Sequence, residues 1–295
     1  SWEGVNCDDD GNVESLYLDD NGLSGSLPEE LFWGLPELSY LSLQTNQLTG
    51  TLPGPAFGGF DGTFSAGAVK LQHLNIGWND LTGTLPSQLG LLEAATFLGF
   101  DSNHVRGVIP TQLARLSLLH NFEMNRNGIS GAIPSELGLM SSMEWSFGLL
   151  HCLLTGSIPS ELGIFSLLSV AFVLGSNKLS GHIPSQLGQL TALKENLGLG
   201  ANKLSGHIPS QLGQLTAFDN SLDLRYNELT GTLPSELGQM TLMHSFLFAS
   251  YNKLTGTLPS ELGRLTGFTR GFQLNDNALC GEVSSSETFN TQHFG

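Results

Sequence analysis

The chain has 295 residues and a net charge of −16, with 11 basic and 27 acidic side chains. This excess of negative charge repels phosphate backbones and anionic lipid, which argues against nucleic-acid binding and against adsorption to membranes. Hydrophobic content is 40%, charged content is 13%, and no run of about 18 apolar residues occurs, which excludes a disordered tail and a transmembrane segment in this chain.

The first segment, "WEGVNCDDDGNVESLYL", places a polar turn before the first expected strand. Asp8, Asp10 and Asn12 alternate as the first ligands of a calcium loop do, but the distal glutamate of such a loop is missing. The segment is therefore interpreted as a polar turn, and no metal site is expected.

From residue 14 onward, a degenerate N-x-L-[S/T]-G pattern recurs every 24 or 25 residues, with one longer step of 33. We call the first residue of this pattern the rung. It is an asparagine in every repeat but one: Asn21, Asn46, Asn79, Asn103, Asn127, Cys152, Asn177, Asn202, Asn227, Asn252 and Asn277. Self-similarity at such a period predicts a solenoid in which each repeat forms one coil.

Each coil is expected to begin with a short strand, because apolar residues stand five and three places before the rung, as Leu222 and Leu224 do before Asn227. A glycine and the dipeptide I/L-P follow, and "S-E/Q-L-G-x-L" then suits a short helical turn. An inward asparagine amide would satisfy backbone groups of neighbouring coils. Cys152 occupies the same inward position, so we expect it to be buried and unreactive.

The repeats "LTGTLPSELGQMT" and "LSGHIPSQLGQLT" resemble the plant-type leucine-rich repeat of receptor-kinase and receptor-like protein ectodomains, polygalacturonase inhibitors and similar algal proteins. The resemblance implies an α/β solenoid: a right-handed, curved leucine-rich repeat superhelix of about eleven coils. A parallel sheet would line its concave side, short helical turns its convex side, and a second line of short strands would lie at "LTGTLP".

The expected organisation is a partial N-terminal cap over 1–13, a solenoid over 14–279 with a loop insertion at about 54–68, and a partial C-terminal cap or tail over 280–295. In the family the cap cysteines pair with nearby cysteines. Cys7 and Cys280 lack such neighbours here, so we expect no disulfide within the chain.

The sequence contains no recognisable catalytic constellation. No Ser-His-Asp arrangement, phosphate-binding loop or paired-carboxylate motif stands out, so no enzyme activity and no cofactor are expected. His182 and His207 occupy equivalent places in consecutive coils, but two histidines without a third ligand make a weak zinc site.

Residues two, four and six places before each rung are expected to face outward from the concave sheet, with the residue directly before the rung beside them. Near both ends of the solenoid these positions carry aromatic and charged residues, whereas the middle coils carry mainly glycine and aliphatic ones. The candidate ligand-binding residues are Tyr17, Tyr40, Trp78, Glu123, Arg126, Asp223, Arg225, Tyr226, Phe248 and Tyr251.

Together with the resemblance, this surface predicts a non-enzymatic, extracellular or cell-surface module that binds a protein, peptide or glycan and no nucleic acid. One alternative is a structural repeat protein of a cell wall, matrix or filament, which would self-associate. Another is ice binding through T-x-T columns such as Thr49 with Thr51 and Thr230 with Thr232, although Arg106 and His207 interrupt them.

Overall fold

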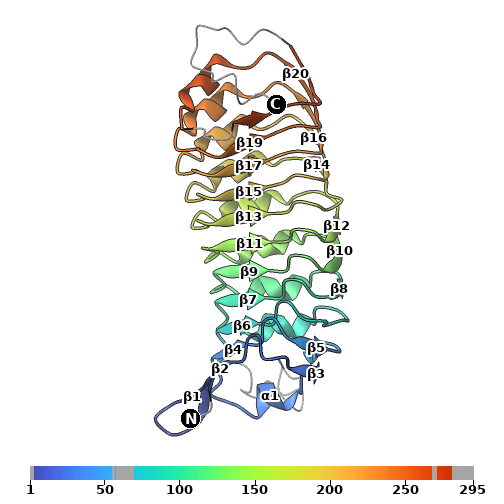
Figure 1. The fold of residues 1–295 in the computed structure, drawn as a ribbon, viewed down its shortest axis with the longest axis vertical. Coiled ribbons are helices and arrows are strands. Elements are labelled where there is room, and N and C mark those ends of the chain that lie inside the picture. The colour runs from blue at the N-terminus through green and yellow to red at the C-terminus, as the bar shows by residue number, and fades with distance from the viewer. Residues whose placement is uncertain (1–2, 55–56, 58–69, 268–270, 281–295) are drawn as a thin grey trace. The chain divides into compact units, whose positions relative to one another are not determined.

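The computed structural model describes residues 3–54, 57, 70–267 and 271–280. The chain divides into two compact units, Ser1–Met143 and Glu144–Gly295, and each is a stack of coils (Figure 1). Most of the expected insertion at 54–68 and nearly all of the expected tail at 280–295 lie outside the described residues.

The first unit is built on a sheet whose strands follow one another in chain order. Strand β1 pairs antiparallel with β2, and every later strand pairs parallel with the one before it. The strands are β1 (Val5–Cys7), β2 (Val13–Tyr17), β4 (Tyr40–Ser42), β6 (His73–Asn75), β7 (Phe97–Gly99) and β9 (Asn121–Glu123). A second line of short strands comprises β3 (Ser24–Ser26), β5 (Gln47–Thr49), β8 (Arg106–Gly107) and β10 (Gly128–Ala132). The turns are α1 (Glu30–Trp33), η2 (Ser87–Leu91), η3 (Thr111–Arg115) and η4 (Ser135–Leu139).

The second unit repeats this plan with greater regularity. Its main parallel sheet contains β11 (Ser146–Gly148), β13 (Ala171–Val173), β15 (Asn196–Gly198), β17 (Ser221–Asp223), β19 (Phe246–Phe248) and β21 (Phe272–Gln273). The second line contains β12 (Leu153–Thr155), β14 (Ser180–His182), β16 (Lys203–Gly206), β18 (Glu228–Gly231), β20 (Lys253–Gly256) and β22 (Ala278–Leu279). The 3₁₀ turns are η5 (Ser160–Ile164), η6 (Ser185–Gln189), η7 (Ser210–Gln214), η8 (Ser235–Gln239) and η9 (Ser260–Arg264). The expected strand, second strand and helical turn thus recur in most of the described coils, while the coil of Asn79 has isolated bridges at Thr82 and Thr84 in place of a second strand.

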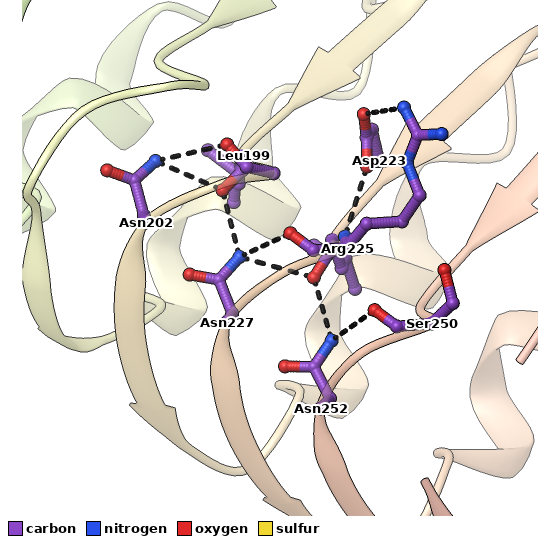
Figure 2. Close-up of polar contacts among 9 residues, drawn as sticks. Leu199, Asn202, Asp223, Arg225, Asn227, Ser250 and Asn252 are labelled. Atoms are coloured by element: carbon purple, nitrogen blue, oxygen red, sulfur yellow. Dashed lines mark hydrogen bonds and ion pairs between the residues drawn. The ribbon is translucent and has the colours of Figure 1, made fainter. Parts of the chain in front are cut away.

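The rung asparagines bind the backbone of adjacent coils, as predicted. In Asn227, Oδ1 accepts from the Leu204 N–H at 3.0 Å. Its Nδ2 donates to the carbonyls of Leu199, Leu224 and Arg225 at 3.1–3.2 Å (Figure 2). Asn202 and Asn252 make equivalent sets of bonds. The amide therefore satisfies backbone groups that a three-residue strand leaves unpaired. Cys152 is buried, and its thiol lies 3.8 Å from the Leu150 carbonyl oxygen.

The 3₁₀ turns pack so closely that their glycines have no room for a side chain. A Cβ on Gly188 would stand 2.3 Å from the Gln211 carbonyl oxygen of the next coil. The same close approach recurs at Gly163, Gly213 and Gly238. The recurring glycine in "S-E/Q-L-G" therefore sets the distance between neighbouring turns.

Register differs between the two lines of strands. In the main sheet of the second unit, equivalent residues lie side by side, as Ser221 and Phe246 do. In the second line the strands are staggered by two residues. The second threonine of a T-x-T pair therefore lies opposite the first threonine of the pair in the next coil. Thr51 bridges Thr82 in this way. The T-x-T pairs therefore form slanted rows, where the sequence alone had indicated straight columns.

Candidate functional site

The strand face of each unit is the outer surface of its main sheet, together with the residue before each rung. All ten candidate residues lie on this face. Tyr17, Trp78, Arg126, Tyr226 and Tyr251 are exposed, and Tyr40, Glu123, Asp223, Arg225 and Phe248 are half-buried. Not every outward position is accessible: Ser42 is buried, because its hydroxyl donates to Asp19 at 2.6 Å and the Asp19 side chain lies beside it.

A ladder of stacked rings runs along the strand face of the first unit. Ring centroids lie 4.4 Å apart between Tyr17 and Tyr40, 4.0 Å between Tyr40 and His73, and 4.2 Å between His73 and Phe97. Because the faces of the inner rings are occupied by their neighbours, the ladder offers mainly ring edges to a ligand. His73 and Phe97 were not among the predicted site residues, although both stand six places before a rung.

Burial shifts the pKa values of two side chains in this ladder, His73 and Tyr40. Desolvation lowers the pKa of His73 to about 4, so its imidazole is neutral at pH 7, and it raises the pKa of Tyr40. The Nε2 atom of His73 is buried and has no hydrogen-bond partner among the residues that the structure describes.

Two carboxylates and a cation lie farther along the same face. Asp101 accepts from the backbone N–H of Asn125 at 2.6 Å, and burial, reinforced by the nearby charge of Glu123, raises the pKa of Asp101 to about 6. The Arg126 guanidinium lies 5.9 Å from the ring centroid of Trp78, within the range of a cation–π contact. Asp101 was missed from the sequence, since its environment depends on packing between coils.

The strand face of the second unit gathers its predicted residues into one platform. Arg225 forms a bidentate ion pair with Asp223 (Figure 2). Its Nε donates to Oδ1 at 3.0 Å, and its Nη2 donates to Oδ2 at 2.8 Å. Its guanidinium also lies 4.1 Å from the centre of the Phe248 ring. Beside it, the rings of Tyr226 and Tyr251 stack with centroids 4.4 Å apart. We call these five residues the Arg225 platform.

Glycines make the neighbouring coils of the second unit smooth. Gly175, Gly198 and Gly200 occupy outward positions on the strand face. A Cβ on Gly200 would lie 2.7 Å from the Asp223 carboxylate, so the Asp223 side chain of the Arg225 platform covers this glycine. All three glycines are themselves buried, so neighbouring atoms cover their backbone beside this charged and aromatic patch.

The residue before each rung has left-handed backbone geometry, with φ between 52° and 58°. Trp78, Arg126, Tyr226 and Tyr251 all occupy this position, which asparagine or glycine adopts with less strain. The geometry recurs in every described coil, so it belongs to the repeat. Its effect is to project four large candidate side chains from a rigid turn.

The remaining candidates have structural explanations. The Asp8 carboxylate accepts from the backbone N–H groups of Asp10 and Asn12, at 3.0 and 2.8 Å, and so closes a turn. His182 and His207 fold over Gly206 and Gly231 of the following coils. Within the described part of the chain, no three His, Cys, Asp or Glu side chains form a group that could hold a metal ion, and no helix is long and apolar enough to cross a membrane. All three cysteines lie among the described residues, and none of them is in a disulfide.

The family model for the Leucine Rich Repeat matches residues 12–33, 70–92 and 220–240. A solved leucine-rich repeat protein of Leptospira interrogans is 30% identical, with a TM-score of 0.62 over 90% of this chain and 67% of that chain. The chain belongs to the leucine-rich repeat proteins.

This leucine-rich repeat chain is similar to several plant proteins. It is 41% identical over 58 residues to a probable leucine-rich repeat receptor-like protein kinase of Arabidopsis thaliana, which covers 20% of this chain and 5% of that protein. The Arabidopsis receptor kinase HAESA, solved in complex with the peptide hormone IDA and the co-receptor SERK1, is 28% identical with a TM-score of 0.77 over 96% of this chain and 53% of that chain. A plant ice-binding protein is 26% identical with a TM-score of 0.77 over 95% of this chain and 86% of that chain. The leucine-rich repeat chain thus spans about half of the HAESA chain and a small part of the receptor-like kinase.

Proposed function

We propose that this chain is a non-enzymatic recognition module that binds an extended protein or peptide segment through its strand face. We further propose that it belongs to an extracellular or cell-surface protein. The observation that carries the first proposal is the Arg225 platform, where an arginine, a phenylalanine and two tyrosines cluster on a rigid sheet. Arginine and aromatic residues dominate binding energy at protein interfaces. Similarity to HAESA, which was solved with a peptide hormone, supports the same conclusion.

The test is a matched pair of double variants of the whole chain. Tyr226→Ala with Tyr251→Ala removes two rings that are 52% and 44% exposed on the strand face. Ile164→Ala with Leu242→Ala removes two apolar side chains, each 58% exposed, at and after the 3₁₀ turns. A partner captured with the wild-type chain is purified, and its affinity for each variant is measured by biolayer interferometry.

We expect the tyrosine pair to weaken binding at least tenfold, because hot-spot side chains contribute about 1–3 kcal/mol each. The Ile164 and Leu242 pair should change affinity less than twofold. The opposite pattern would place recognition on the 3₁₀ turns and refute the proposal.

Ice binding is a second candidate, favoured by the plant ice-binding protein of which this chain covers 86%. The surface concerned is the second line of strands, where Thr51 stands opposite Thr82. Its rows are slanted and interrupted, as Thr84 opposite Arg106 shows. The assay is inhibition of ice recrystallisation: activity that Thr51→Tyr with Thr82→Tyr abolishes would establish this function, and an inactive wild-type chain would exclude it.

A further inference from the structure

Asp101 and Glu123 form a pair of half-buried carboxylates on the strand face of the first unit. Glu123 belongs to β9, opposite Gly99 of β7, and Asp101 follows Gly99 by two residues. The two side chains thus come from adjacent coils and face the same way. Burial and their mutual repulsion both disfavour the second charge.

No cation of the described chain neutralises this pair. Ion pairs among the described residues include Lys70 with Glu37, His104 with Asp80, Arg225 with Asp223 and Lys253 with Glu228, and none of these involves Asp101 or Glu123. Arg126 lies over the Trp78 ring, and its charge is the weakest of the influences on the Asp101 carboxyl. In the second unit, by contrast, Asp223 receives both prongs of Arg225.

Asn121 provides an independent observation on the same strand. It stands two residues before Glu123, so alternation along β9 places both side chains on the strand face. Asn121 is 3% exposed, and its Nδ2 atom has no acceptor in the described chain. A buried amide N–H without an acceptor is costly, and a carbonyl or hydroxyl oxygen would satisfy it.

We propose that Asp101 and Glu123 bind the cationic side chain of a lysine or arginine in an extended peptide, and that the side chains covering the Nδ2 atom of Asn121 shift so that it donates to a main-chain carbonyl of the same peptide. This inference rests on the proposed function and specifies its ligand as a basic peptide segment. An ordinary peptide carries both groups, since a cationic side chain is attached to a backbone rich in carbonyls. The spacing fits as well, because Asn121 and Glu123 are separated by about two strand residues, roughly 7 Å.

The probe is a blocked hexapeptide of alternating glycine and lysine, compared with the same peptide in which norleucine replaces lysine. Binding to the whole chain is measured by isothermal titration calorimetry at pH 7.5 and low ionic strength. The test variant is Asp101→Asn with Glu123→Gln. The control is Glu93→Gln with Glu136→Gln, which removes two exposed carboxylates of the same unit and changes the net charge equally.

We expect the test variant to bind the lysine peptide at least tenfold more weakly, the control variant to bind within twofold of wild type, and the norleucine peptide to bind far more weakly than the lysine peptide. Binding by the wild-type chain should also strengthen between pH 5 and pH 7, as Asp101 ionises, and Asp101→Asn should flatten that profile. Equal losses in the two variants would show general attraction to an acidic protein and overturn the proposal.

A second variant, Asn121→Leu, tests the carbonyl contact. It should weaken the peptide severalfold while leaving the melting temperature unchanged or higher, because it removes an unsatisfied buried amide. If spermidine binds as tightly as the lysine peptide and Asn121→Leu has no effect, the site binds cations without recognising the peptide backbone, and the proposal fails. If the lysine peptide does not bind the wild-type chain while Tyr226→Ala with Tyr251→Ala still abolishes partner binding, the proposed function stands without this site.

Discussion

Replacing a rung asparagine should destabilise the chain by far more than replacing an ordinary polar residue. Asn227→Ala deletes four hydrogen bonds to the backbone in one step. Figure 2 shows those that Nδ2 donates. The Leu199 carbonyl keeps a bond from Asn202, and the Leu224 carbonyl keeps one from Asn252. The Leu204 N–H, however, loses the acceptor that Asn227 provides.

The magnitude follows from that inventory. An orphaned buried N–H costs about 1–3 kcal/mol, and the loss of the shared bonds and of side-chain volume adds roughly 1 kcal/mol. We therefore expect Asn227→Ala to lower the free energy of unfolding by about 2–4 kcal/mol. Asn220→Ala is the control, because the half-buried Asn220 amide bonds only to the hydroxyl of the adjacent Ser221 at 3.1 Å.

The assay is urea denaturation followed by circular dichroism, with both variants measured beside the wild-type chain. The control should change the free energy of unfolding by less than about 0.5 kcal/mol. If Asn227→Ala is as mild as Asn220→Ala, the rung amides do not hold adjacent coils together and the reasoning is wrong.

Other substitutions test separate parts of the structure. Asp101→Asn should stabilise the chain by about 1–3 kcal/mol at pH 7 and have little effect at pH 3.5, because the raised pKa of about 6 makes the native state lose stability as pH rises from about 4 to 6. His73→Phe should reduce the fall in melting temperature between pH 6.5 and pH 4, since a native pKa of about 4 means that protonation favours the unfolded chain in that window. Gly188→Ala should cost about 1–3 kcal/mol in urea denaturation, because its Cβ would collide with the Gln211 carbonyl. Cys152→Asn should raise the melting temperature, since an amide supplies donors to the backbone that the thiol lacks.

The repeat pattern was enough to predict the coil and its inward residues. A period of 25 residues, apolar positions such as Leu222 and Leu224, and a polar rung leave few ways to bury a continuous core. The proline after each second strand and the glycine of "S-E/Q-L-G" marked the 3₁₀ turns for equally local reasons. These features depend on backbone conformation and burial, which each repeat specifies by itself.

Contacts between coils could not be read in the same way. The ladder through His73 and Phe97 depends on side-chain rotamers in neighbouring coils, and one coil of this pattern resembles any other. The two-residue stagger that sets Thr51 opposite Thr82 arises from the path of the chain between sheets. The unpaired Asp101 was missed for a related reason, since a charge is recognised as unpaired only when its surroundings are known.

Hydroxyl-radical footprinting with a purified partner tests strand-face recognition most directly. Side-chain oxidation is compared between the free chain and the complex, at exposed residues of both surfaces. Binding through the strand face should protect Trp78, Tyr226 and Tyr251 while Leu139 and Ile164, at the ends of 3₁₀ turns, oxidise at unchanged rates. Protection of Leu139 and Ile164 with unchanged oxidation of the three aromatic residues would contradict the account.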